Sequence, residues 1–521
     1  MTSVPKKSER AKAARTPRGS RTKSPAPTAA QPAAQPQASG TGAAEAKVPE
    51  ATGGGSAARA WVRVYCQGLG DCILVRVKRE DADDFKLMID CGVVLGTDDA
   101  GAKMTGVVEN ILKDTNQKVD VLVITHEHWD HLSGFIQADD SFSKLAVGSV
   151  WVAWTEDPDD KLANELRDEL GKAEKALAAC AAALQAAGDG ATPGALADIA
   201  LSPLGAAASS STSTRAAFEA AKAKAKVRLC RPTDPPLDIP GTNARIYVLG
   251  PPHDPTLIRK INPSTTSPET YGLAMNGDGA LSIGMVEALA NPPAANGQTA
   301  PVQVDKAAPF HQRVTIPLGP KGRPLTYDSH SVVEEDWRRN DDFLREHYSG
   351  SASDDWRRID GDWLGSSTEL ALALQSYTNN TSLVLALELG DPGKGNVLLF
   401  AADAQVGNWE SWQTWQCQID GATVTGPDLL KRTIFYKVGH HGSHNATLKG
   451  HGLEQMDALK AAIIPVDEVE AKKKRWGSMP LPDLISALEQ KAPGMVLRTD
   501  KKPAQPPQNV VMGENYFEIQ L

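Results

Sequence analysis

Residues 125–134 read THEHWDHLSG and directly follow an apolar run, VDVLVI, that is typical of a strand covered on both faces. Three histidines and two acidic residues fall within six positions of this stretch. In an extended backbone, His126 and His128 project to the same side and can share one ion, whereas Asp130 and His131 turn back toward a second. Imidazole nitrogen combined with carboxylate oxygen suits zinc, manganese or iron and argues against calcium or magnesium. The stretch therefore predicts a metal site.

A second histidine window, KVGHHGS at 437–443, follows another apolar strand. Between the two windows, NVLLFAAD at 396–403 is a further apolar run that ends in a carboxylate. Both windows open at the C-terminal end of a strand, which is where α/β folds place their sites. We expect the two windows to meet at one edge of the fold.

Short apolar runs predict the remaining strands of a mixed sheet flanked by helices. They lie at 61–77 (two strands around a Gly-rich turn), 86–90, 119–125, 382–389, 396–403, 433–441 and 461–466.

The motif H-x-H-x-D-H, followed in order by Asp403 and by KVGHHGS, resembles the metallo-β-lactamase superfamily of hydrolases. This resemblance implies an α/β fold, a four-layer αββα sandwich, over the chain from about residue 60 to its end. Five further sequence motifs resemble those of the metallo-hydrolase domain of bacterial DNA-uptake channel proteins. They are QGLGD at 67–71, IDCG at 89–92, LGPP at 249–252, NTS at 380–382 and HHGS at 440–443. Membrane helices like those of the channel are absent, so transport is not implied.

The resemblance further implies two divalent metal ions, most readily zinc, with manganese and iron as alternatives. The implied metal ligands are His126, His128, Asp130, His131, Asp403 and His440. Asp130 would also orient the attacking hydroxide, and His441 would contact a substrate oxyanion. Because sequence cannot orient adjacent side chains, the roles of His440 and His441 can be exchanged.

Other residues are candidates for supporting roles. His253, in GPPHD, is a possible further metal ligand or an ordinary loop residue. Residues expected to hold ligands in place or to line the site are Asp71, Asp90, Asn380, Ser382 and Ser443, with ordinary strand-end turns as the alternative for the two aspartates.

Composition divides the chain into a tail and a domain. Residues 1–57 are rich in Ala, Pro and Ser, without one aromatic, Leu or Ile, which predicts a disordered basic tail. Residues 58–521 are expected to form the metallo-β-lactamase-like domain. It carries a helical-hairpin insert at about 155–230, from apolar positions that recur every three or four residues, and a long irregular insert at about 255–365.

Charge and cysteine usage narrow the possible partners and location. The net charge is −9, although the first 50 residues hold nine Lys and Arg against three Glu. The acidic body is a poor general binder of nucleic acid, so nucleic acid is a possible partner only through a local patch or the tail. Scattered cysteines without C-x-x-C pairs, no apolar run long enough for a bilayer, and no secretory signal predict a cytoplasmic location without a membrane partner.

These features predict a metal-dependent hydrolase whose metal-bound hydroxide attacks a phosphodiester, in a nucleotide or nucleic-acid-like substrate. The first alternative is hydrolysis of a carboxylic ester, thioester or lactone by the same site. The second is an interaction protein that binds a protein partner through its helical insert, with a secondary hydrolase core.

Overall fold

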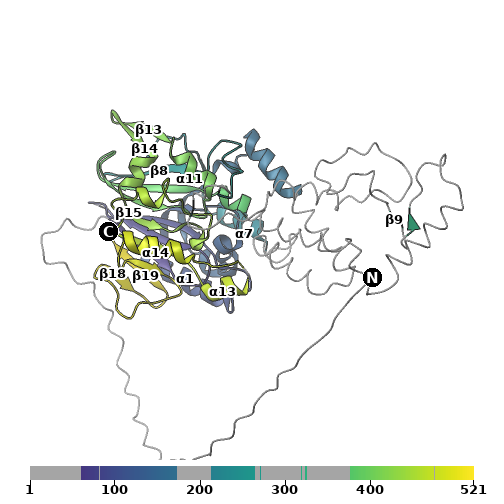
Figure 1. Ribbon diagram of the computed structural model, residues 1–521. Helices are drawn as coiled ribbons and strands as arrows, with labels where there is room; N and C mark the ends of the chain where they lie inside the picture. The colour runs from purple at the N-terminus through teal and green to yellow at the C-terminus, as the bar shows by residue number, and fades with distance from the viewer. Residues whose placement is uncertain are drawn as a thin grey trace, which may run out of the picture. The chain divides into compact units, whose positions relative to one another are not determined.

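The computed structural model describes residues 60–80, 82–172, 213–263, 270, 376–474 and 476–521, together with the backbone of two short strands, β9 (Leu318–Gly319) and β10 (Arg323–Pro324). The predicted tail at 1–57 and most of the predicted insert at 255–365 lie outside the described residues. Figure 1 shows the described part as two sheets with helices on their outer faces.

The first sheet has eight strands in the order β18-β19-β1-β2-β3-β4-β5-β6. Their bounds are β1 Ala60–Tyr65, β2 Cys72–Val77, β3 Phe85–Cys91, β4 Lys118–Val123, β5 Ala146–Ala153, β6 Val227–Cys230, β18 Val510–Met512 and β19 Tyr516–Gln520. β3, β4, β5 and β6 run parallel, whereas the hairpin partners on the other side run antiparallel. The sheet is therefore mixed, as the sequence predicted.

The second sheet has seven strands in the order β17-β16-β15-β12-β11-β8-β7. Their bounds are β7 Leu237–Asp238, β8 Ala244–Gly250, β11 Val384–Leu389, β12 Asn396–Phe400, β15 Thr433–Lys437, β16 Ala461–Ile464 and β17 Val496–Arg498. β12, β15, β16 and β17 are parallel, so their carboxyl ends share one edge. A separate hairpin pairs β13 (Gln416–Ile419) with β14 (Ala422–Thr425).

Short helices connect and cover the strands. The α-helices are α1 Ala100–Thr115, α2 Trp129–Leu132, α3 Gly134–Gln137, α4 Asp139–Phe142, α7 Thr214–Lys222, α11 Val406–Trp412, α12 Gly426–Lys431, α13 Glu468–Lys473 and α14 Pro482–Lys491. The 3-10 turns are η1 Trp154–Glu156, η5 Gly439–Gly442 and η6 Leu453–Gln455, and residues 161–172 are also helical.

Alternation along the strands builds three apolar layers. On β3, Leu87 and Ile89 face the second sheet, whereas Met88 belongs to the cluster beneath α1 and α7. On β11, Leu385 lies between the sheets and Ala386 packs toward α11 and α12. Because a strand sends successive side chains to opposite faces, this pattern makes a helix–sheet–sheet–helix sandwich. The fold is the predicted α/β four-layer αββα arrangement.

The predicted helical insert is only partly visible. Residues 173–212, which connect the two predicted helices, lie outside the described residues. The second helix, α7, packs on the domain: Phe218 is buried in the core beside α3, and β6 adds an edge strand to the first sheet.

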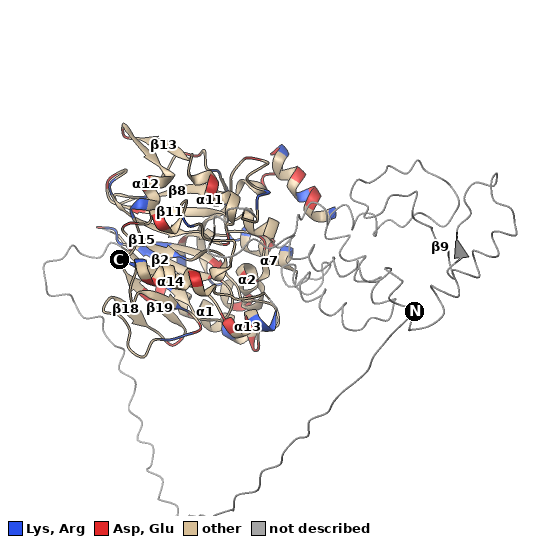
Figure 2. Cartoon of the chain, in the orientation of Figure 1, with Lys and Arg blue, Asp and Glu red and all other residues tan. Residues whose placement is uncertain are grey.

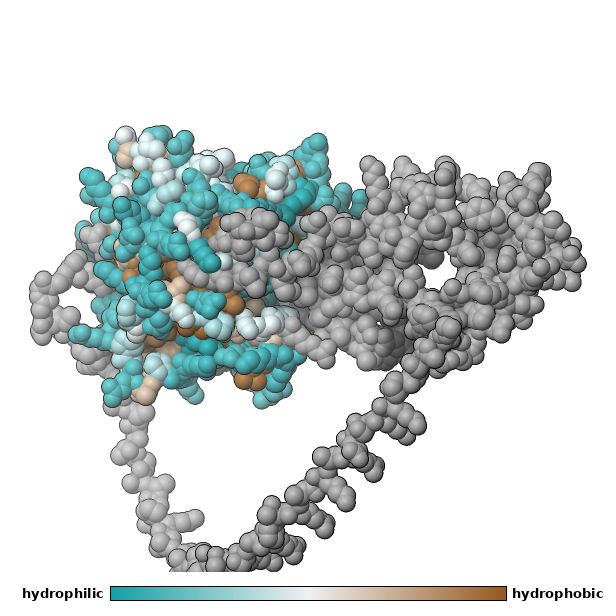
Figure 3. Space-filling view, in the orientation of Figure 1, coloured by the Kyte–Doolittle hydropathy of each residue, from teal (hydrophilic) through white to brown (hydrophobic). Residues whose placement is uncertain are grey.

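The surface of the described part is polar and mixed in charge. Acidic and basic residues are interspersed in Figure 2, and hydrophobic residues are scattered among hydrophilic ones on the face in Figure 3. Within the described ranges, no helix has the length and apolar character needed to cross a membrane.

Candidate metal centre

The predicted ligand residues come together where strands from both sheets end. The first histidine window follows β4, and Asp90 stands at the end of β3. Asp403 follows β12, and the second histidine window follows β15. The backbone N–H of Leu383 donates to the carbonyl of Thr125 at 2.8 Å, which joins the two sheets at this edge. Parallel strands place their carboxyl ends together, so residues far apart in the chain share one site.

Four buried residues, Asp130, His131, Asp403 and His441, form a group whose ligand atoms all lie within 4.8 Å of one another. Asp71, Asp90 and His131 form a second buried group by the same measure. Asp403 Oδ2 is 3.3 Å from His131 Nε2 and 3.5 Å from His441 Nε2. Asp130 Oδ2 is 3.1 Å from His441 Nε2 and 4.0 Å from His131 Nε2. Two carboxylates and two imidazoles at these separations match the donor set that holds a zinc-like ion.

His126 and His128 form a second set of nitrogens beside this group. His126 Nε2 lies 3.1 Å from His128 Nδ1, and the rings of His126 and His131 are 4.2 Å apart. Ser382 Oγ lies 3.3 Å from His126 Nδ1 and accepts a hydrogen bond from the backbone N–H of Asp403 at 3.2 Å. The serine therefore ties this pair to the Asp403 loop.

The histidine tautomers fit metal binding. Carbonyl and carboxylate oxygens can only accept, so His441 Nδ1 donates to Pro465 O at 2.7 Å and Nε2 donates to Asp130 Oδ2 at 3.1 Å. A bound ion would take the place of the proton on Nε2. His131 Nδ1 lies 2.8 Å from Asp90 Oδ2, which leaves Nε2 directed at Asp403. The buried Nε2 atom of His128 has no hydrogen-bond partner, and the buried Nε2 atom of His131 makes no hydrogen bond although Asp403 Oδ2 lies 3.3 Å away. Buried polar atoms are normally satisfied, so these orphaned nitrogens fit the coordination of an ion.

The electrostatics of the site separate two kinds of histidine. Burial lowers the pKa of His128 to about 4, and burial with the neighbouring imidazoles lowers the pKa of His126 well below its usual value. Burial also acts to lower the pKa of His131 and of His441, but the surrounding carboxylates, Asp403 foremost, raise both above the usual value. A cluster this rich in carboxylate charge attracts cations.

Asp403 carries the negative charge that the cluster depends on. Burial would raise its pKa, yet His441, His131 and Lys437 hold the pKa well below the usual value for a carboxyl group. The carboxylate is thus kept ionised at the centre of the group.

Lys437 is a buried member of the site that the sequence analysis did not single out. Its Nζ lies 2.5 Å from Asp71 Oδ2 and 3.5 Å from Asp403 Oδ1, and it donates to Ala402 O at 3.0 Å. Because a buried lysine is normally paired with an acidic group, a lysine at the end of an apolar strand in KVGHHGS could have predicted a buried ion pair at the site. The ammonium group compensates two carboxylates at once.

Asp90 and Asn380 brace the site rather than enter the four-residue group. Asp90 accepts from the backbone N–H and the hydroxyl of Thr125 at 2.8 and 2.6 Å, in addition to its contact with His131. Asn380 donates to the carbonyl of Ile258 at 2.8 Å and accepts from the backbone N–H of Gln405 at 3.2 Å. Both therefore fix loops around the candidate ligands.

The structure separates the adjacent histidines in the second window. Both have left-handed backbone, with φ of 43° at His440 and 52° at His441. His441 points into the four-residue group, whereas His440 is half-buried, with Nε2 3.0 Å from Asn379 Nδ2 and Nδ1 3.3 Å from Asn445 Oδ1. The sequence analysis named His440 as the metal ligand and left open its exchange with His441. The placement of the two side chains favours the exchange, with His441 as the ligand.

Two other predicted residues lie apart from the group. Ser443 Oγ is 3.4 Å from His444 Nδ1. His253 belongs to neither His/Asp group: its ring is half-exposed, packs against Trp154, and lies 2.8 Å from Asp160. The geometry therefore gives His253 a surface ion-pair partner and does not bring it to the candidate metal ligands.

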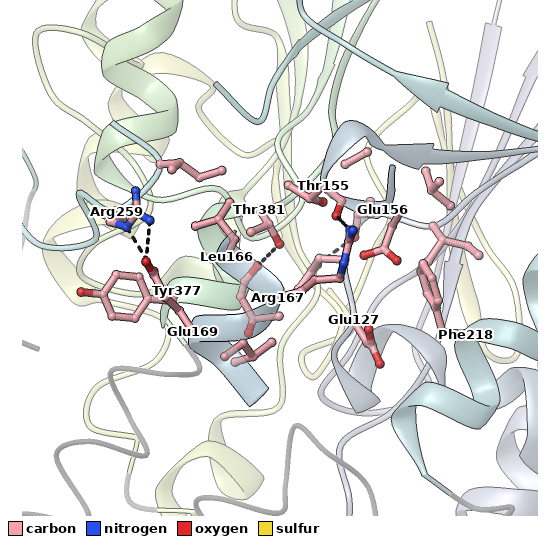
Figure 4. Close-up of a pocket in the computed structure, with 18 residues that line it drawn as sticks. Glu127, Thr155, Glu156, Leu166, Arg167, Glu169, Phe218, Arg259, Tyr377 and Thr381 are labelled. Carbon is pink, nitrogen blue, oxygen red and sulfur yellow. Dashed lines mark hydrogen bonds and ion pairs between the residues drawn. The ribbon is translucent and has the colours of Figure 1, made fainter. Parts of the chain in front are cut away.

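A cavity of about 400 Å³ adjoins the histidine cluster. Figure 4 shows its walls, which come from the start of the first histidine window, from β5 and η1, from helical residues 161–172, from α7, from the turn at Ile258, and from helical residues 376–380 with Thr381 after them. Its lining residues are Ile124, Thr125, His126, Glu127, Val152, Ala153, Thr155, Glu156, Leu166, Arg167, Glu169, Leu170, Phe218, Ile258, Arg259, Tyr377, Thr378 and Thr381. His126 thus belongs to both the metal-binding cluster and the cavity.

Comparison with known proteins agrees with this geometry. Residues 67–148 match the family model described as the metallo-beta-lactamase superfamily, a range that includes the whole first histidine window. No curated protein and no solved structure matches the chain. Residues 67–148 are therefore similar to the metallo-β-lactamase superfamily, and this similarity together with the buried His/Asp cluster indicates a metal-dependent hydrolase.

Proposed function

We propose that this hydrolase uses two divalent cations, with zinc the first candidate. His126 and His128 would hold one ion, His131, Asp130 and His441 would hold the other, and Asp403 would supply a further carboxylate. The observation that carries the proposal is the group of buried ligand atoms within 4.8 Å of one another, beside a buried His128 Nε2 that has no hydrogen-bond partner.

The ions would polarise the scissile group and lower the pKa of water toward about 7. The chain's own residues orient the reactants. Asp90 and the Pro465 carbonyl hold the rings of His131 and His441, and Asp130 is placed to accept a hydrogen bond from the attacking water. His440 lies beside these ligands, where its Nε2 accepts a hydrogen bond from Asn379 Nδ2 at 3.0 Å, so it would contact an oxygen of the substrate only if the substrate displaced Asn379.

We propose a carboxylic ester as the substrate class. Water oxygen bonds to the carbonyl carbon, the carbon–oxygen bond to the alcohol breaks, and the alcohol leaves with a proton. The charge around the site supports this choice, because the arginines beside it are engaged by protein acceptors: Arg259 by Glu169, and Arg215 by Glu127 and Glu156. An anionic substrate would have to compete for them.

A phosphodiester is the second candidate, supported by the HHGS motif at 440–443 and its resemblance to DNA-uptake hydrolase domains. The basic residues outside the site give a phosphodiester substrate little support. Lys472 and Lys473, in the basic run of α13, pair with Glu468 and Glu470. A protein partner for the helical insert and a cytoplasmic location stay predictions.

The test is hydrolysis of 4-nitrophenyl butyrate and of bis(4-nitrophenyl) phosphate by full-length protein reloaded with zinc, manganese or iron. We expect metal-dependent turnover of the ester, which is lost in the His126→Ala, His128→Ala double variant. Turnover of the phosphodiester alone would reverse the order of the two candidates. No turnover of either compound with two ions bound would contradict the assignment of both substrate classes.

A further inference from the structure

We propose that the cavity beside His126 is the substrate's specificity site and that it binds an uncharged, apolar acyl group. This inference rests on the proposed ester hydrolysis, because it names the part of the ester that the enzyme recognises. It goes further in assigning a recognition role to helical residues 161–172, which supply one wall.

The wall is mainly hydrocarbon. Leu166 and Leu170 from residues 161–172 line it together with Phe218 of α7, Ile258 of a turn and Tyr377 of helical residues 376–380. Leucine, phenylalanine and tyrosine side chains attract apolar groups because binding removes apolar surface from water. Figure 4 shows Leu166, Phe218 and Tyr377 among the residues that line the cavity.

The charged side chains in the wall are engaged by other protein groups. Arg167 donates to the carbonyl of Asp157 at 2.9 Å and to Asn164 Oδ1 at 2.6 Å, and also contacts the Thr155 carbonyl. Arg259 donates to both carboxylate oxygens of Glu169, at 2.8 and 3.2 Å.

The two remaining acidic residues of the wall share one cation. Arg215 Nη1 lies 3.0 Å from Glu127 and 3.4 Å from Glu156. Salt bridges thus pair the wall's glutamates with Arg215 and Arg259, and Arg167 is held by neutral oxygens of the protein. A charged ligand would have to displace one of these bonds and lose its hydration, whereas an uncharged, apolar group would not.

Size and position identify the group as part of the substrate. A volume of about 400 Å³ lies within the roughly 300–1,000 Å³ of ordinary small-molecule sites. His126 is at the wall of the cavity and in the candidate metal centre, so an acyl chain in the cavity brings its carbonyl to the reacting edge.

The first test compares 4-nitrophenyl esters from acetate to octanoate with metal-loaded, full-length protein. We expect kcat/KM to rise by about three- to fourfold per added CH₂ until the cavity is full. Leu170→Trp fills the cavity, and we expect it to lower the octanoate-to-acetate ratio at least tenfold. Glu165→Trp adds the same bulk to an exposed position of the same helix and should keep the wild-type ratio. A ratio near one in the wild type would overturn the proposal.

The second test does not depend on catalysis. Calorimetry on metal-free, full-length protein compares 4-phenylbutanamide, which is uncharged, with the 4-phenylbutanoate anion. We expect the amide to bind more tightly and Leu170→Trp to weaken it at least tenfold. Tighter binding of the anion, or no binding of the amide, would overturn the proposal. Amide binding without ester hydrolysis by the loaded enzyme would instead contradict the proposed function and leave the cavity's ligand class standing.

Discussion

Asp90 Oδ2 lies 2.8 Å from His131 Nδ1, and neither side chain is exposed to solvent. The carboxylate lies outside the four-residue group but shares a second buried group with Asp71 and His131, and its contact with Nδ1 orients the His131 ring. Partners of this kind determine both the tautomer of a metal-binding histidine and the direction of its lone pair.

Asp90→Asn keeps the shape of the side chain and removes the charge that holds His131. We expect metal affinity to fall about 10- to 100-fold, because the ring loses its fixed orientation. Isothermal titration of metal-free protein with zinc measures the change. Asp140→Asn, on the exposed surface of α4, is the control and should bind zinc like the wild type. Equal affinities in all three proteins would rule out the orienting role.

Replacing Lys437 by Met tests the buried ion pair with Asp71. The substitution leaves two buried carboxylates without their shared cation, so we expect the free energy of unfolding of the metal-free protein to fall by about 3–5 kcal/mol. Denaturant melts followed by circular dichroism measure it. Bound zinc should restore part of the loss, since it compensates the same carboxylates.

Lys460→Met is the matched control for this experiment. Lys460 is exposed just before β16, and its substitution should change the unfolding free energy by less than about 0.5 kcal/mol. Similar small effects for Lys437 and Lys460 would show that the ion pair does not stabilise the fold.

The adjacent histidines give a prediction in which each variant controls for the other. His441→Ala removes a nitrogen from the four-residue group, so we expect the purified protein to lose at least one metal ion. His440→Ala lies outside that group and should keep both ions, with a smaller loss of kcat than His441→Ala. Metal analysis and steady-state kinetics on the same preparations separate the outcomes. Loss of metal from His440→Ala alone would return the ligand role to His440.

Local sequence was sufficient to predict the fold and most of the cluster. The strand-then-histidine pattern at 119–131 places several donors within one short loop, and such a pattern needs no knowledge of distant contacts. The alternation of apolar residues in β3 and β11 likewise determines which faces are buried. These features confirm the predicted four-layer sandwich.

Features that depend on tertiary contacts could not be predicted in the same way. The direction of His441 follows from two consecutive residues with left-handed backbone and from the Pro465 carbonyl on another strand's loop. The burial of Lys437 depends on Asp71, which comes from the opposite sheet. The cavity combines Leu166, Phe218 and other residues of separate segments, so no single stretch of sequence contains its pattern.

Gly92 gives a steric test of how the site is assembled. A Cβ at this position would lie 2.5 Å from the backbone of Asp130, closer than real Cβ atoms approach. The backbone N–H of Gly92 also donates to Asp71 O at 3.0 Å, so the loop cannot move away without losing that bond. Gly92 is therefore required for the close approach of the β3 loop to the first histidine window.

Gly92→Ala should push Asp130 out of the four-residue group. We expect the unfolding free energy to fall by about 1–3 kcal/mol, the usual cost of overpacking, and metal content to fall with it. Gly106→Ala makes the same chemical change in the middle of α1, where no atom lies within 4 Å of the new Cβ. That variant should gain about 0.5–1 kcal/mol, because alanine is the better helix former, and should keep its metal. If Gly92→Ala bound metal as well as Gly106→Ala does, the close contact with Asp130 would not be what positions the ligand.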